Sequence, residues 1–297
     1  MSTSSPYIGR FAPSPTGPLH FGSLVAALAS FLDAKAHRGQ WLVRMEDLDP
    51  AREPEGAADD ILTALEQLGL EWDGAVLYQS QRLEQYAHTL QLLEEKGLIY
   101  PCACSRAQIK EMGGIYDNRC RNGAKTHGPY AKRMKVTAQT IAFTDRVQGP
   151  QSQNLIQECG DFVLVRKDGL FAYQLAVVAD DAFQGITDIV RGIDLLDSTA
   201  RQIYMQEQLG FSRPQYAHIP VAVNELGQKL SKQHFAKALT LSRPQELLYA
   251  AMQFLGLTPE PDLLKGSVAD TLQWGVEHWD IQKVPKLANI QLDKQFL

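Results

Sequence analysis

Apolar and polar residues along the first hundred positions follow a pattern that predicts strands and helices in turn. The segment 82–96 is the clearest helix, because Leu83, Tyr86, Leu90 and Leu93 recur at helical spacing and Gly97 follows as a stop signal. The expected elements here are strands at 7–11, 40–45 and 76–79 and helices at about 20–36, 54–69 and 82–96. This alternation is typical of an α/β fold, and we expect a doubly wound, parallel, Rossmann-like sheet.

The pattern becomes polar and weakly periodic after about residue 98 and regains apolar density at residue 161. The later elements that we expect are a hairpin at 162–173 with Asp168-Gly169 as its turn, a strand at 186–190, a helix at 194–209 and a strand at 217–223. Ser242 to Gln245 resembles a capping box before another helix, and a short helical tail follows. We therefore expect a catalytic domain over 1–97 and 161–240, an inserted small α+β subdomain over 98–160, and a C-terminal helical region over 241–297.

Composition and charge limit the class of protein. The chain has 297 residues, of which 44% are hydrophobic and 21% charged, and its formal net charge is −5. These values are typical of a globular protein in solution. The first residues lack the regions of a secretory signal, and the apolar run 21–32 is too short to cross a bilayer. We expect a cytoplasmic protein without membrane contact, in which any contact with RNA comes from a local basic surface.

The stretch 7–23 predicts a phosphate site. A short strand leads into a loop in which Pro13, Pro15 and Gly17 exclude helix, and a helix then begins near His20. The free N–H groups at a helix start attract phosphate, His20 offers a donor, and Gly22 allows a nucleotide to approach the backbone. The loop is neither the dinucleotide nor the P-loop pattern. An ordinary strand–loop–helix with a loop histidine is the alternative.

A second segment, 227–233, carries Lys229 and Lys232 in a Gly/Ser/Lys-rich loop. Two lysines on such a loop suit a triphosphate, although a solvated basic loop would look the same. Together the two segments resemble the signatures of the class I aminoacyl-tRNA synthetases: Pro-Leu-His-Phe-Gly-Ser corresponds to the HIGH element and Lys-Leu-Ser-Lys-Gln to the KMSKS element. Arg10-Phe-Ala-Pro-Ser-Pro-Thr-Gly resembles the start of a glutamyl-tRNA synthetase. Ser23 departs from the pattern, which often has a second histidine there.

Polar residues at strand ends are the candidate substrate ligands. Glu46 follows the strand 40–45 and Arg191 follows the strand 186–190, where ligands bind in open α/β sheets. From the residues alone, core packing for Tyr173 and an ion pair of Arg191 with Asp180, Asp181 or Asp188 remain alternatives. The resemblance implies that glutamate contacts a set comprising Arg10, Phe11, Ala12, Pro13, Ser14, Glu46, Tyr173 and Arg191. It also implies that ATP, with Mg²⁺, contacts His20, Gly22, Lys229 and Lys232, of which His20, Lys229 and Lys232 are the catalytic residues.

Three of the four cysteines, Cys102, Cys104 and Cys120, fall within about twenty residues. Such clustering favours a metal over a disulfide in the cytoplasm, and zinc prefers four ligands. The fourth ligand could be Tyr116, His127 or water, and three structural cysteines without metal are the alternative. The chain resembles a truncated synthetase subfamily with the ligand set Cys-x-Cys…Tyr-x-x-x-Cys, which implies one structural Zn²⁺ per chain and places Tyr116 in that set.

This subfamily lacks an anticodon-binding domain and attaches glutamate to queuosine at the wobble position of tRNA(Asp). The resemblance therefore implies a monomeric ligase-type enzyme whose partners are ATP, L-glutamate and queuosine-bearing tRNA(Asp). The expected phosphate contacts of the RNA lie in the insert, at Arg119, Arg121, Lys125, Lys132 and Arg133. The alternatives are a small glutamyl-tRNA synthetase that charges a tRNA 3′ end, a nucleotidylyltransferase of the same superfamily, and a catalytically inactive tRNA- or metal-binding paralogue.

Overall fold

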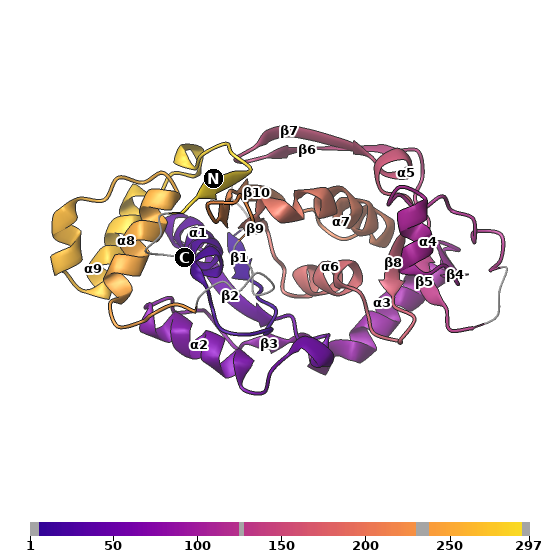
Figure 1. The fold of residues 1–297 in the computed structure, drawn as a ribbon, viewed down its shortest axis with the longest axis horizontal. Helices are drawn as coiled ribbons and strands as arrows, with labels where there is room; N and C mark the ends of the chain where they lie inside the picture. Colours follow the sequence, from indigo (N-terminus) through magenta and orange to yellow (C-terminus); the bar gives the residue numbers. More distant parts are fainter. Residues whose placement is uncertain (1–5, 125–127, 230–237, 293–297) are drawn as a thin grey trace.

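The structure is a computed structural model that describes residues 6–124, 128–229 and 238–292 (Figure 1). The strands are β1 (Ile8–Phe11), β2 (Gln40–Met45), β3 (Leu77–Tyr78), β4 (Ile99–Cys102), β5 (Ala131–Met134), β6 (Thr140–Asp145), β7 (Gly149–Asn154), β8 (Phe162–Val165), β9 (Asp188–Gly192), β10 (Gln215–Ile219), β11 (Val221–Val223) and β12 (Asn289–Gln291). The α-helices are α1 (Phe21–Ala36), α2 (Ala57–Gln67), α3 (Leu83–Glu95), α4 (Arg106–Glu111), α5 (Leu155–Glu158), α6 (Tyr173–Phe183), α7 (Leu196–Leu209), α8 (Pro244–Phe254) and α9 (Val268–His278).

Parallel strands form the centre of the molecule, as the sequence predicts. β2 pairs in parallel with both β1 and β3, and β10 pairs in parallel with both β9 and β6. The two groups meet at β1 and β9, where the N–H of Thr187 donates to the carbonyl oxygen of Ile8 at 2.9 Å. The carboxyl ends of β1, β2 and β9 therefore lie near one another, and these ends carry several of the expected ligands.

Helix α1 packs directly against this junction. It contacts β1, β2 and β9 on one side and α8 and α9 on the other (Figure 1). Because α1 is covered on both sides, its apolar residues lie around most of the helix surface and not on one face only. Leu24, Leu28 and Leu32 are fully buried. The start of α1 is thereby held rigidly beside the ends of β1 and β2.

A second, antiparallel sheet has the order β4-β5-β8. Its strands come from both sides of residue 160. β8, which comes after residue 160, pairs with β5, whereas β6, from inside the expected insert, pairs with β10 of the central sheet. The ribbon of β6 and β7 runs along one side of the molecule between these two regions (Figure 1).

Two local expectations need correction. The expected hairpin at 162–173 forms only in part: an antiparallel bridge joins Val165 to Phe171, the N–H of Arg166 donates to the carbonyl oxygen of Leu170 at 2.8 Å, and Tyr173 then begins α6 instead of continuing the second strand. The cap of α8 is Arg243 rather than Ser242, with Pro244 in the first turn and no side-chain cap bond. The helix nevertheless forms because its apolar face packs on α1 and α9.

The C-terminal region also contains a strand, β12. It pairs in parallel with β11, the strand that precedes the segment with Lys229. Among the described residues, no helix combines the length and the apolar character that crossing a membrane requires.

Candidate active site

A cavity of about 590 Å³ lies at the carboxyl ends of β1, β2 and β9, beside the start of α1. Every expected glutamate or ATP ligand lines this cavity except Lys232, which lies outside the described residues. The lining ligands are Arg10, Phe11, Ala12, Pro13, Ser14, His20, Gly22, Glu46, Tyr173, Arg191 and Lys229. Residues more than 200 positions apart in the sequence thus meet at one site.

The loop between β1 and α1 is held at both ends. The N–H of Glu46, just after β2, donates to the carbonyl oxygen of Pro13 at 2.9 Å. His20 caps α1, and its Nδ1 accepts the N–H of Ser23 at 3.2 Å. The first N–H groups of α1 are therefore presented at the cavity, as an anion site requires.

Four charged side chains with little exposure form a row of ion pairs beside the cavity. They are Arg10, Asp181, Arg44 and Glu46. Asp181 lies between two arginines: its Oδ1 is 3.1 Å from Nε of Arg10 and 2.8 Å from Nη2 of Arg44. Arg44 in turn lies 3.6 Å from Oε1 of Glu46. The contact between Arg44, in β2, and Asp181, in α6, could not be predicted from the sequence. Neither residue belongs to a motif that would place the two side chains together.

Among these four groups, Glu46, like Arg10, lines the cavity. Burial raises the pKa of its carboxyl to about 7, and the charge of nearby Arg44 opposes that rise. Its Oε1 is buried and accepts no hydrogen bond from the described residues. A buried carboxylate oxygen of this kind is costly unless a partner arrives, and a ligand ammonium group would be such a partner.

Arg191 differs from Arg10 because its hydrogen bonds within the described part of the chain go to neutral acceptors. Nη1 donates to Oε1 of Gln202 at 2.9 Å and to Oη of Tyr173 at 3.3 Å. Nη2 donates to Oγ1 of Thr199 at 2.9 Å, and Nε donates to Nε2 of His218 at 3.0 Å. Arg191 is only 4% exposed, so its charge is buried beside the cavity, and no carboxylate of the described residues is in contact with it.

The ion pair considered for Arg191 is ruled out by where the three aspartates point. Asp180 binds Arg82, Asp181 binds Arg10 and Arg44, and Asp188 binds Arg146. An uncompensated buried guanidinium is strongly suited to a substrate carboxylate.

Lys229 stands at the mouth of the cavity. A bridge to Val223 holds its backbone, and Nζ lies 2.6 Å from Oδ2 of Asp194. Both side chains are partly exposed, so solvent screens this pair and an incoming phosphate can compete for the lysine.

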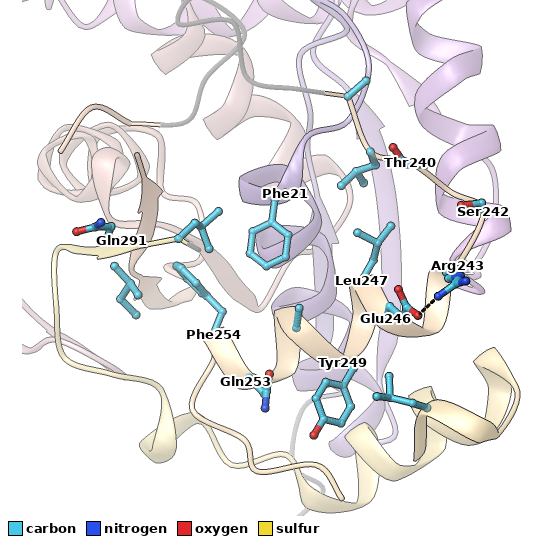
Figure 2. A pocket seen from close by; sticks show the side chains of 16 residues that line it. Phe21, Thr240, Ser242, Arg243, Glu246, Leu247, Tyr249, Gln253, Phe254 and Gln291 are labelled. Carbon is cyan, nitrogen blue, oxygen red and sulfur yellow. Dashed lines mark hydrogen bonds and ion pairs between the residues drawn. The ribbon is translucent and has the colours of Figure 1, made fainter. Parts of the chain in front are cut away.

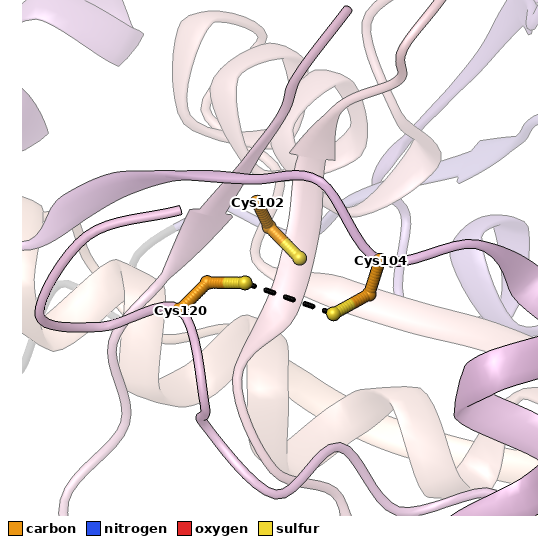
Figure 3. A group of neighbouring side chains, drawn as sticks. All are labelled: Cys102, Cys104 and Cys120. Atoms are coloured by element: carbon orange, nitrogen blue, oxygen red, sulfur yellow. Dashed lines mark hydrogen bonds between the residues drawn. The ribbon is translucent and has the colours of Figure 1, made fainter. Parts of the chain in front are cut away.

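The three clustered cysteines lie close together (Figure 3). The sulfurs of Cys102, Cys104 and Cys120 all lie within 4.8 Å of one another, and those of Cys104 and Cys120 are 3.6 Å apart. Thiolates bound at about 2.3 Å around a tetrahedral zinc ion have similar separations. This cluster can therefore bind a metal ion.

Tyr116 lies against this cluster with its hydroxyl. Its hydroxyl lies 3.3 Å from Sγ of Cys102 and 3.9 Å from Sγ of Cys104, and it accepts the N–H of Cys120 at 3.1 Å. Gly160 allows this approach, because its φ is +67° and a Cβ there would lie 2.3 Å from the carbonyl oxygen of Tyr116. His127, the other protein candidate for fourth ligand, lies outside the described residues.

Part of the expected RNA-binding surface is wrong. Arg133 is buried, with its guanidinium 3.9 Å from the ring centroid of Tyr116, and Arg121 binds the buried Asp161. Arg133 therefore packs on Tyr116 beside the cysteine cluster, and Arg121 is held by Asp161. Arg119 and Lys132 are exposed but form ion pairs with Asp117 and Glu94, and Lys125 lies outside the described residues.

A second cavity, of about 630 Å³, lies on the other side of α1, between α8 and β12 (Figure 2). Its walls combine apolar side chains such as Phe21, Leu247 and Phe254 with polar ones, and the Arg243–Glu246 ion pair lies at one edge. None of the expected ligands that the structure describes lines it, so the catalytic assignments remain with the first cavity.

The fold and the cavity can be compared with known proteins. The family model for the catalytic domain of class I tRNA synthetases (E and Q) matches residues 8–261. The glutamate-tRNA synthetase structure from Elizabethkingia anophelis has a TM-score of 0.78 and 24% identity, with 98% of this chain and 69% of that chain covered. The chain therefore belongs to the class I tRNA synthetases and has their α/β fold.

Curated relatives define the group more narrowly. Glutamyl-Q tRNA(Asp) synthetase of Pseudomonas fluorescens is 53% identical over 97% of both chains. The enzyme of the same name from Aromatoleum aromaticum is 51% identical, over 95% of this chain and 91% of its own. Within the class I family, this chain is a ligase-type enzyme of the glutamyl-Q tRNA(Asp) synthetase group.

Proposed function

We propose that the protein activates L-glutamate with ATP and transfers the glutamyl group to queuosine at the wobble position of tRNA(Asp). The observation that carries this proposal is that Arg191 and Glu46 line one cavity. Among the described residues, the hydrogen bonds of Arg191 go to neutral groups, and Oε1 of Glu46 accepts no hydrogen bond. An α-amino acid with an acidic side chain has the complementary groups. The names of the relatives supply the RNA acceptor.

In the activation step, a glutamate α-carboxylate oxygen attacks the α-phosphorus of ATP. A new O–P bond forms, the bond to the β-phosphate oxygen breaks, and pyrophosphate leaves. Arg191 and Tyr173 hold the glutamate side chain, Glu46 holds its ammonium group, and Arg10 and the loop residues from Phe11 to Ser14 complete the site. The start of α1 at His20 and Gly22, together with Lys229 and Lys232, binds the phosphates, which ATP carries with Mg²⁺.

In the transfer step, a hydroxyl of the queuosine cyclopentene ring attacks the glutamyl carbonyl carbon. The ester bond forms, the carbonyl–phosphate bond breaks, and AMP leaves. The protein supplies position and charge, and neither step needs a covalent bond to a side chain.

The cysteine cluster fits a structural role for one Zn²⁺ per chain. Cys102, Cys104, Cys120 and Tyr116 would hold it, and the ion would stabilise the β4-β5-β8 sheet rather than enter the reaction. We also infer a cytoplasmic monomer with the catalytic, inserted and C-terminal regions expected from the sequence.

The acceptor can be tested with labelled glutamate, ATP and two tRNA pools, one with queuosine and one without. We expect label only on queuosine-containing tRNA(Asp), and we expect it to remain when the 3′ ribose alone is blocked. Glutamate esterified to the terminal adenosine would instead identify an enzyme that charges the 3′ end.

Binding of glutamate should depend on the ionisation of Glu46. Because its pKa is about 7, the carboxyl loses its charge as the pH falls, and its attraction for the ammonium group is lost with it. We expect the glutamate KM in ATP–pyrophosphate exchange to rise between pH 8 and pH 6, approaching about tenfold per unit at the acid end. Glu46→Gln should give a high KM that is flat over this range. A wild-type KM that does not change with pH would contradict this role.

A further inference from the structure

A buried histidine and aspartate lie directly behind Arg191. His218, on β10, and Asp145, at the end of β6, both have fully buried side chains. Nδ1 of His218 lies 2.6 Å from Oδ2 of Asp145, and Nε2 lies 3.0 Å from Nε of Arg191. Asp145, His218 and Arg191 thus form a continuous line that ends at the cavity.

The hydrogen-bond partners determine which nitrogen of His218 carries the proton. Nε of Arg191 can only donate, so Nε2 of the ring must accept, and the proton of a neutral ring must then be on Nδ1. Asp145 accepts that proton's hydrogen bond. Burial lowers the pKa of His218, although Asp145 opposes the change, and a neutral ring agrees with this arrangement.

The two oxygens of Asp145 have separate tasks. Oδ1 accepts the N–H groups of Val147, Gln148 and His218, at 3.0, 2.9 and 3.1 Å, and so holds the turn after β6 and its junction with β10. Oδ2 contacts the ring of His218. The turn needs only Oδ1, which the amide oxygen of an asparagine could replace. The contact of Oδ2 with His218 therefore needs a separate explanation.

We propose that Asp145 and His218 are positioning residues that orient the Arg191 guanidinium toward the substrate carboxylate. Asp145 holds the ring in the Nδ1–H tautomer, and Nε2 then fixes the Nε edge of Arg191. Thr199 and Gln202 fix the other two nitrogens, so the guanidinium is held on three sides. This inference deepens the proposed function and rests on it for the identity of the carboxylate. Neither residue touches the substrate.

Asp145→Asn separates the two tasks. The amide oxygen can keep the three backbone hydrogen bonds, while the amide NH₂ faces Nδ1 and forces the ring into the Nε2–H tautomer. That proton opposes the Nε–H of Arg191, and the guanidinium must move. The same exchange in a Ser-His-Asp site reverses the histidine tautomer while preserving geometry.

We expect Asp145→Asn to raise the glutamate KM in ATP–pyrophosphate exchange by about tenfold to a hundredfold, as for a buried donor left without its acceptor. The ATP KM and the melting temperature should change little. Asp188→Asn is the matched control. Asp188 is also a buried aspartate, but it lies on β9 and pairs with Arg146, so the glutamate KM of this variant should stay near that of the wild type. An unchanged glutamate KM in Asp145→Asn, or an equal rise for both substrates, would overturn the proposal.

Nitrogen-15 NMR of the histidine rings tests the tautomer without any assay of activity. We expect the wild-type resonances of His218 to show protonated Nδ1 and unprotonated Nε2 at pH 7.5. A wild-type ring that is doubly protonated or protonated at Nε2 refutes the arrangement, even if the variant fails to fold. If the wild type activates no glutamate, the proposed function fails while this measurement still decides the tautomer.

Discussion

Replacing Arg191 with alanine should reduce kcat/KM for glutamate in ATP–pyrophosphate exchange by about 10²–10³-fold, as expected when one partner of a buried, hydrogen-bonded charge pair is removed. Arg191 has no carboxylate contact among the described residues, whereas Asp181 already neutralises Arg10. Within the described part of the free enzyme, the buried positive charge of Arg191 therefore has no carboxylate in direct contact, and the substrate carboxylate would be the first. We expect most of the loss to be in KM, because Arg191 would contact the substrate carboxylate equally in the bound ground state and in the transition state.

Two further variants show whether charge or geometry matters. Arg191→Lys keeps the charge but loses the forked donors that reach Tyr173, Gln202 and Thr199, so we expect an intermediate loss. Arg213→Ala is the control, since Arg213 is exposed and donates only to the carbonyl oxygen of Ala142 among its described contacts. Activity of Arg191→Ala close to that of Arg213→Ala would show that the substrate carboxylate binds elsewhere.

Cys120→Ser should abolish stoichiometric metal binding and lower the free energy of unfolding by at least about 3 kcal/mol. Structural zinc contributes on the order of 10 kcal/mol in small zinc domains, and removing one of three thiolates forfeits much of it. Zinc content by mass spectrometry and the thermal or urea unfolding midpoint measure the two effects. The activation reaction in the folded fraction should change far less, because the cluster lies outside the cavity lining.

Cys159 is a matched control within the same chain. It is half-buried and outside the cluster, and its Sγ contacts the carbonyl oxygen of Gly160 at 3.1 Å. Cys159→Ser should keep the metal and change stability by no more than about 1 kcal/mol. Equal effects of the two variants, or wild-type protein prepared without chelator that holds no zinc, would rule out the metal site.

Features that depend on near neighbours could be predicted from the sequence. The strand at Gln40–Met45 and the helix at Leu83–Glu95 follow from local hydrophobic periodicity, and the loop before α1 follows from its prolines. The ligands in the two signature segments could be named because each segment is continuous. The cavity brings these segments together as expected, with Lys232 outside the described residues.

Pairing between distant segments could not be predicted. The residues 170–173 are as apolar as a strand, yet packing of Tyr173 and Leu175 into the core ends the hairpin and begins α6. Arg133 looks like a surface cation in sequence, but β5 turns it inward onto Tyr116. The burial of a side chain depends on which strands lie beside it, and the local sequence pattern does not indicate which strands these are.

The sequence by itself determined most local elements, the two signature segments, the cysteine spacing and the candidate ligands that line the cavity. Only the tertiary structure decided how their charges are paired. It gave Arg10 a carboxylate partner and left Arg191 with neutral ones, and it placed Asp145 and His218 behind that arginine. The physical reason is that the ionisation and orientation of a buried group depend on all the groups that face it, and these come from strands and helices far apart in the chain.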